Sequence, residues 1–110
     1  MMTAQELATV AQYGLPIITI IANNGTFGTI RMHQEREYPG RVVGTTIVNP
    51  DFVAMAKSFG LEGVRVETTA AFAPAFKAAL ASRKATVIEV KLDPEALAVR
   101  KTLTQIRENK

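Results

Sequence analysis

Apolar and polar residues follow one another along the chain in blocks that predict alternating helices and strands. The nearly continuous apolar run Leu15–Ala22 stops at two asparagines, which is typical of a buried parallel strand. Val64-Arg65-Val66-Glu67 alternates apolar and polar residues, which predicts a short strand. Ala85–Leu92 predicts the last strand, and its Val87-Ile88-Glu89-Val90 core suggests one covered face and one partly polar face. Strands that alternate with helical segments favour an α/β fold, a parallel sheet with flanking helices. Because three strands make a small sheet for this class, we expect them to be part of a larger domain.

Capping residues predict the helices of the first half of the chain. Thr3 and Glu6 have the spacing of a capping box, which predicts a helix over residues 4–13 with Gly14 at its end. A second, short helix is predicted over residues 28–36, directly after the asparagine turn.

The second half has its own start and stop signals. Asn49-Pro50-Asp51 predicts a helix with Asn49 as N-cap, and Gly60 ends it. Thr68 or Thr69 is expected to cap a long helix that runs to about Ser82. Asp93-Pro94-Glu95 predicts the beginning of a C-terminal helix, or of a tail with a helical beginning. Residues 38–48 have no clear period and are expected to form an ordered loop.

Composition restricts the function classes. The 110 residues contain no cysteine and a single histidine, His33, which excludes a disulfide framework, a thiolate metal site and a His-rich zinc site within one chain. The net charge of +3 comes from scattered basic residues, so we expect no nucleic-acid partner. No apolar run has membrane-spanning length and no signal peptide is evident, so we expect no membrane partner and a cytoplasmic location.

The turn after the first strand carries the candidate chemistry. Asn23 and Asn24 follow the carboxyl end of the strand, where open parallel sheets bind ligands. Amide oxygens suit a hard cation such as Mg²⁺, and Gly25 and Gly28 allow the backbone to approach a phosphate. The helix that follows can direct free N–H groups at an anion. An Asn-Gly turn also occurs without any function, so a plain strand-to-helix turn remains the alternative.

The sequence resembles a known family over essentially its whole length. The likeness begins with Met1–Thr9, Tyr13–Pro16 and Ala22–Arg31. It continues in His33-Gln34-Glu35, Tyr38-Pro39-Gly40-Arg41, Asn49-Pro50-Asp51-Phe52, Val87-Ile88-Glu89-Val90 and Asp93-Pro94. These segments resemble the C-terminal cofactor domain of thiamine-diphosphate-dependent enzymes, in the branch of acetolactate synthase and benzoylformate decarboxylase.

The resemblance implies which residues bind the cofactor and its metal. Asn24 would give its side-chain oxygen to Mg²⁺, and Thr26 would give its backbone carbonyl, so that the side chain of Thr26 would matter little. Gly28 and Thr29 would lie against the diphosphate and the reactive end of thiamine diphosphate. Ile30 would line the pocket near the substrate.

The resemblance gives the neighbouring polar residues less definite roles. Asn23 is expected to hold the loop through hydrogen bonds. His33 and Gln34 would reach the active site from the short helix, with an exposed or loop-packing histidine as the alternative. Arg31 would pair with a substrate carboxylate or, alternatively, form a surface or interdomain salt bridge.

The activity implied by the resemblance is decarboxylation or carboligation of a small 2-oxo acid, in a homodimer or homotetramer. The family activates its cofactor with a glutamate of another domain, so no catalytic residue is assigned here; Glu6 and Glu35 are interpreted as helix or loop carboxylates. The family's metal motif begins with Gly-Asp-Gly, which is expected upstream of Met1 in a longer enzyme, so that residues 1–110 would be the C-terminal portion of the domain and inactive alone. The alternative is a non-catalytic α/β remnant or oligomerisation module.

Overall fold

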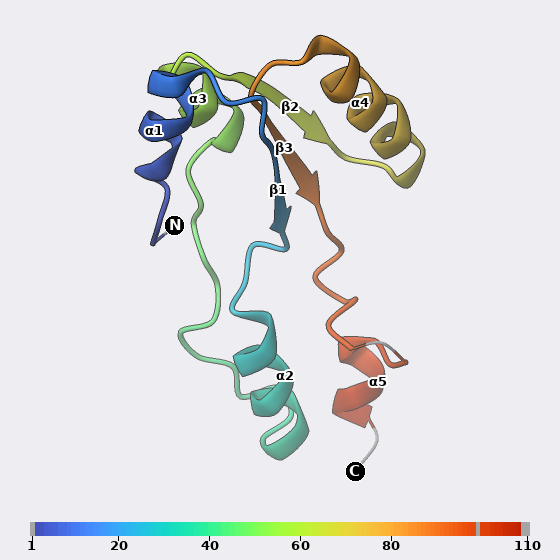
Figure 1. The fold of residues 1–110 in the computed structure, drawn as a ribbon. Helices are drawn as coiled ribbons and strands as arrows, with labels where there is room; N and C mark the ends of the chain where they lie inside the picture. Colours follow the sequence, from blue (N-terminus) through green and yellow to red (C-terminus); the bar gives the residue numbers. More distant parts are fainter. Residues whose placement is uncertain (1, 99, 109–110) are drawn as a thin grey trace. The chain divides into compact units, whose positions relative to one another are not determined.

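The computed structural model describes residues 2–98 and 100–108. The chain forms two compact units (Figure 1). Unit 1 comprises Met1–Asn23 and Pro50–Lys91, and unit 2 comprises Asn24–Asn49 and Leu92–Lys110. Met1, with which the family-like segment begins, lies outside the described residues. No helix in the described ranges has the length and apolar character needed to cross a membrane.

Unit 1 is built on a parallel sheet. Its three strands are β1 (Ile18–Asn23), β2 (Glu62–Val66) and β3 (Thr86–Lys91), in the spatial order β1-β3-β2. Both neighbours run parallel to β3, with Ile20 and Val64 each opposite Ile88. The predicted parallel α/β sheet is therefore confirmed, although β1 begins three residues later than expected and β2 two residues earlier.

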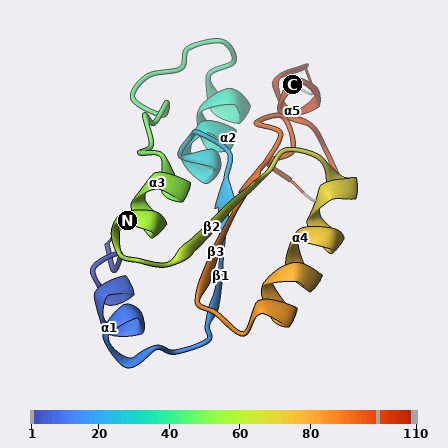
Figure 2. The same cartoon turned by 90° about the horizontal axis from the view of Figure 1, so that it is seen from above.

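Helices cover both faces of this sheet (Figure 2). α1 (Glu6–Tyr13) and α3 (Phe52–Ser58) lie on one face, and α4 (Thr69–Ser82) lies on the other. The core against α1 and α3 is built around Leu7, Ala56, Leu61 and Val87. The core against α4 is built around Val66, Ala79 and Ile88. Burial of these apolar side chains supplies the main driving force for the fold of unit 1.

The central strand buries a charge that the sequence pattern had placed on a partly polar face. Glu89 is only 1% exposed. Asn23 Nδ2 donates to Glu89 Oε1 at 2.7 Å, and Arg65 Nε donates to Oε2 at 2.8 Å. Lys91 Nζ lies 3.3 Å from Oε1. Burial alone would raise the pKa of Glu89, but the hydrogen bonds from Arg65, Asn23 and Lys91 outweigh it and lower the pKa.

Two predicted helix starts are wrong in detail. The Thr3 carbonyl, not its hydroxyl, accepts the Glu6 N–H at 3.1 Å, so the residues before α1 form turns and the helix has no side-chain cap. In α3 the N-cap is Asp51 instead of Asn49. Asp51 stays extended after Pro50, and its Oδ1 accepts the Ala54 N–H at 2.9 Å.

Other predicted ends are confirmed. Gly14 ends α1 in the left-handed conformation, at φ +59°. Thr68, the first of the two candidates, caps α4 and accepts the Ala71 N–H. Pro74 lies inside α4.

Unit 2 contains α2 (Gly28–Glu37) and α5 (Leu103–Glu108), which pack against each other. The bounds of α2 agree with the predicted helix over residues 28–36. The predicted helix start at Asp93 is wrong, because Asp93 Oδ1 accepts the Glu95 N–H at 2.9 Å and closes a single turn. The helix begins ten residues later, where Thr102 and Gln105 form a reciprocal capping box.

We predict that Glu89→Ala destabilises the protein by about 3 kcal/mol, because it removes the buried partner of Asn23 and Arg65. Glu62→Ala is the control. Its ion pair with Lys84 is solvent-exposed, and its loss should change the free energy of unfolding by less than about 1 kcal/mol. Urea unfolding followed by circular dichroism measures both. Equal effects of the two substitutions would contradict a structural role for the Glu89 cluster.

Candidate functional site

The asparagine turn connects the end of β1 to the start of α2. Asn24 Oδ1 accepts the backbone N–H of Thr26 at 3.1 Å, which closes a tight turn around Gly25. Gly25 has φ +65°, a conformation that favours glycine. The side-chain oxygen of Asn24 thus lies close to the backbone of Thr26. An amide oxygen has two lone pairs, so Asn24 can accept this bond and still coordinate a cation.

The turn is held by residues 45–47, which follow α2 in the sequence. Thr26 forms an antiparallel bridge with Thr46. Two backbone hydrogen bonds flank the bridge, from Phe27 N to Thr45 O at 2.8 Å and from Ile47 N to Gly25 O at 3.0 Å. This is the non-hydrogen-bonded type of pair, in which the N–H and C=O of the paired residues point away from the opposite strand.

The bridge between Thr26 and Thr46 determines which way the carbonyl of Thr26 points. Its N–H is taken by Asn24, its hydroxyl donates to Thr45 O at 2.6 Å, and its carbonyl is directed away from residues 45–47. No hydrogen bond within the described ranges ends on this carbonyl. Thr26 therefore presents a backbone oxygen in the same turn as the Asn24 side chain, which is a pair of oxygen ligands of the kind that Mg²⁺ prefers.

Gly28, at the start of α2, lies close to the side chains of Asn24 and Leu97, which would have to shift to admit a larger residue. A Cβ at this position would lie 2.9 Å from Asn24 Nδ2 and 2.9 Å from Leu97 Cδ2. The N-cap residue, Phe27, offers no side-chain acceptor to the first turn. The N–H groups of Gly28, Thr29 and Ile30 are therefore available to an anion, at the positive end of the helix dipole.

The donor chemistry of the turn fits a metal bound to a diphosphate. No cluster of three or more His, Asp or Glu side chains occurs in the described part of the chain. Neutral oxygens of Asn24 and Thr26 are suitable where the ligand itself supplies negative charge. Two buried oxygens of unit 2, Gln34 Oε1 and Thr45 Oγ1, have no hydrogen-bond partner among the residues that the structure describes.

The structure gives the remaining candidates of α2 definite environments. Ile30 is 54% exposed, so unit 2 itself does not cover it. His33 is also exposed. Gln34 Nε2 donates to Val43 O at 2.8 Å and so ties α2 to the following loop. Asn23 is buried, and its partner Glu89 belongs to a strand of the sheet rather than to the loop.

Glu35 is the residue whose role sequence reasoning missed. It is fully buried in unit 2 and accepts hydrogen bonds from Arg31 (2.9 Å), Arg107 (2.7 Å) and the Gly40 N–H (2.9 Å). The hydrogen bond from Arg107 is the main cause that lowers the pKa of Glu35 from 4.5 to about 2, against the opposing effect of burial.

Arg31 forms a salt bridge, as the second of its two interpretations expected, but its partner is the buried Glu35 of the same helix rather than a surface or interdomain residue. The four-residue spacing of the pair is a signal that the sequence offers. The contact with Arg107, 72 residues away, has no local signal.

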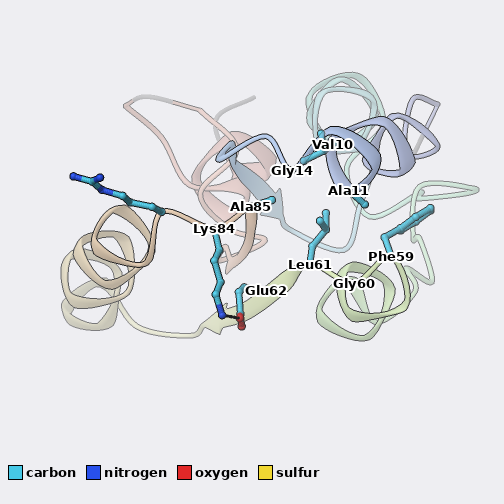
Figure 3. A pocket seen from close by; sticks show the side chains of 10 residues that line it. Val10, Ala11, Gly14, Phe59, Gly60, Leu61, Glu62, Lys84 and Ala85 are labelled. Carbon is cyan, nitrogen blue, oxygen red and sulfur yellow. Dashed lines mark hydrogen bonds and ion pairs between the residues drawn. The ribbon is translucent and has the colours of Figure 1, made fainter.

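A cavity of about 510 Å³ in unit 1 is a separate feature (Figure 3). It is lined by the end of α1, by residues 59–62 and by residues 83–85, which precede β2 and β3. Figure 3 shows the Glu62–Lys84 ion pair at its margin, with 3.4 Å between Nζ and Oε1. The cavity thus lies at the amino ends of the strands, whereas α/β sheets bind ligands beyond the carboxyl ends.

Comparison with known proteins agrees with this geometry. Residues 1–90 match the family described as thiamine pyrophosphate enzyme, C-terminal TPP binding domain. The chain belongs to this family. Thiamine pyrophosphate is thiamine diphosphate, so the family resemblance and the cofactor class predicted from the sequence are confirmed.

The individual relatives are much longer than this chain. The acetolactate synthase large subunit of Parasynechococcus marenigrum is 40% identical over 92 residues, which cover 82% of this chain and 15% of the relative. A putative thiamine pyrophosphate-containing protein of Bacillus subtilis is 36% identical over 86% of this chain and 16% of its own length. The chain thus spans about 15% of the relatives it matches.

A solved structure supports the fold. The thiamine diphosphate-dependent 4-hydroxybenzoylformate decarboxylase of Rhodococcus jostii aligns with a TM-score of 0.72 and 38% identity. The alignment covers 82% of this chain and 17% of that enzyme. The α/β sheet described above is therefore the one used by a thiamine diphosphate-dependent enzyme.

The ion cluster of Glu35 makes the packing of α2 on α5 sensitive to acid. A carboxylate whose folded pKa lies below its unfolded pKa stabilises the folded state above the unfolded value, and this contribution is lost as the pH falls. We predict that the α2–α5 contact is at full strength above pH 4.5 and weakens as the pH falls toward about 2. Amide hydrogen exchange of α5 as a function of pH measures this.

Glu35→Gln is the matched variant, because it removes the titrating group and keeps the shape. Its α5 exchange, corrected for intrinsic rates, should lose most of the dependence on acidic pH. An unchanged pH profile would contradict the assignment of the effect to Glu35.

Proposed function

We propose that the domain binds thiamine diphosphate together with Mg²⁺ as part of a 2-oxo acid decarboxylase or carboligase that is acetolactate synthase-like. The observation that carries the proposal is the joint placement of Asn24 Oδ1 and the outward carbonyl of Thr26 in one turn, directly before the uncapped N-terminus of α2. A cation and a diphosphate are bound by complementary groups, and this short segment offers both.

Each of the five predicted residues has a role in this proposal. Asn24 and Thr26 would hold Mg²⁺ through their side-chain and backbone oxygens. Gly28 and Thr29 would lie against the diphosphate, since the backbone of Gly28 lies close to the Asn24 side chain. Ile30, exposed on unit 2, would line the pocket near the substrate.

The cofactor supplies the chemistry in this enzyme class, which is the decarboxylation of 2-oxo acids or their ligation to a second carbonyl compound. The contribution of these residues is binding and orientation. No side chain in the described ranges is assigned a catalytic role, and the substrate, a homodimeric or homotetrameric assembly and a cytoplasmic location belong to the proposal. The alignment to acetolactate synthase and to a benzoylformate-type decarboxylase supports the substrate class.

We predict that Asn24→Ala weakens Mg²⁺-dependent binding of thiamine diphosphate at least ~10-fold, because it removes a metal ligand while the backbone of the turn remains. Isothermal titration of the purified protein with thiamine diphosphate, with and without Mg²⁺, measures the change. Asn24→Asp, which keeps a side-chain oxygen, should retain metal-dependent binding.

Gln105→Ala is the control for a general loss of structure, since it weakens the cap of α5 and leaves the turn intact. Its affinity should equal that of the wild type. Because the Gly-Asp-Gly half of the metal motif is expected in a longer chain, the decisive sample is the longer enzyme that contains this domain. If that enzyme binds no thiamine diphosphate in the presence of Mg²⁺, the proposed function is contradicted, and the non-catalytic α/β module takes its place.

A further inference from the structure

We propose that the side-chain hydroxyl of Thr26 is a positioning group for the metal site, because it fastens the metal-binding turn to the segment 45–47. The inference rests on the proposed function, and it assigns a role to a side chain where the family resemblance implied a role for the backbone alone. The two residues that hold the turn, Thr26 and Thr45, lie 19 positions apart in the sequence.

The geometry at Thr45 O is the first argument. This carbonyl oxygen accepts two hydrogen bonds, from Thr26 Oγ1 at 2.6 Å and from Phe27 N at 2.8 Å. The hydroxyl bond is short and partly buried, so solvent does not readily replace it. Two donors from consecutive residues on one acceptor restrain the rotation of the peptide that joins them. That peptide contains the Thr26 carbonyl.

The register of the bridge is the second argument. Thr26 and Thr46 form a non-hydrogen-bonded pair, so the only direct link from residue 26 itself to the opposite segment is its side chain. Without the hydroxyl, the backbone bonds of Gly25 and Phe27 remain on either side, but residue 26 loses its own contact with residues 45–47. The peptide that carries the proposed metal-binding oxygen would then be held on Thr45 O by one hydrogen bond instead of two, and its orientation would be less restrained.

Two flanking features show that the loop is held on the other sides. Asn24 Oδ1 binds the Thr26 N–H from one direction, and Gln34 Nε2 binds Val43 O and thereby ties the loop before Thr45 to α2. Thr45 is 1% exposed, so its carbonyl is a fixed point rather than a mobile loop atom. The hydroxyl of Thr26 thus adds to a set of hydrogen bonds that already hold the turn from its other sides.

The test compares three variants of the intact protein in their affinity for the metal. Thr26→Val keeps the shape and removes the hydroxyl, and Thr26→Ser keeps the hydroxyl. Thr45→Val leaves the accepting carbonyl in place and removes only a buried hydroxyl that has no partner among the described residues. Mn²⁺ serves as the probe, and its binding is measured by electron paramagnetic resonance in the presence of thiamine diphosphate.

We expect Thr26→Val to weaken Mn²⁺ binding about 10-fold, the lower bound for loss of a group that orients a metal ligand. Thr26→Ser should restore the wild-type affinity, and Thr45→Val should leave it unchanged. If the effect were merely structural, the unfolding temperature of Thr26→Val would fall. In that case Thr26→Ser would not restore the metal affinity. If Thr26→Val binds Mn²⁺ as tightly as the wild type, or if Thr45→Val weakens it equally, the inference is overturned.

Hydrogen exchange of the wild-type protein provides a measurement that does not depend on a variant. The Phe27 and Ile47 amides should be protected, because both bonds flank the Thr26 side chain. Free exchange of both amides would overturn the inference even if Thr26→Val failed to fold. Failure of the wild type to bind Mn²⁺ and thiamine diphosphate would instead contradict the proposed function.

Discussion

The pair of backbone hydrogen bonds between residues 25–27 and 45–47 is the constraint on which the candidate site depends. It fixes the register of Thr26 opposite Thr46, and this register determines that the Thr26 carbonyl faces away from the partner segment. The Asn24 side chain then occupies the remaining N–H of the turn, and the helix begins two residues later at Gly28. The oxygens proposed to bind the metal, a turn and a helix N-terminus are thereby placed within five residues by backbone geometry, with no charged side chain.

Local signals in the sequence were sufficient for most of the fold. Apolar runs identified β1 and β3 because the strands of a buried parallel sheet are almost continuously apolar, and alternation of apolar and polar residues identified β2. Helix caps were harder to predict than strands, because a sequence with the spacing of a capping box can form backbone turns instead. The capping box predicted at Thr3 is replaced by backbone turns, while an equivalent spacing at Thr102 and Gln105 does form the cap of α5. The two motifs differ in tertiary context, which the sequence does not reveal.

The sequence was less informative about what holds the site together. Spacing and resemblance identified the asparagine turn, because its residues are contiguous. The supports are distant in sequence: Thr45 holds Thr26 from 19 residues away, and Arg107 reaches Glu35 from 72 residues away. Glu89 was placed on a partly polar face because it is charged, whereas Arg65 and Asn23 allow it to be buried on the central strand. Such pairs have no periodic signature.

The most direct measurement is a titration of the isotopically labelled protein with thiamine diphosphate and Mg²⁺, followed by the amide chemical shifts. If the turn and the first turn of α2 bind the cofactor, the amides of Gly28, Thr29 and Ile30 shift at saturation, and those of residues 59–62 and 83–85 around the unit 1 cavity do not. Shifts confined to that cavity, with none in the first turn of α2, would contradict the assignment of the asparagine turn as the cofactor site.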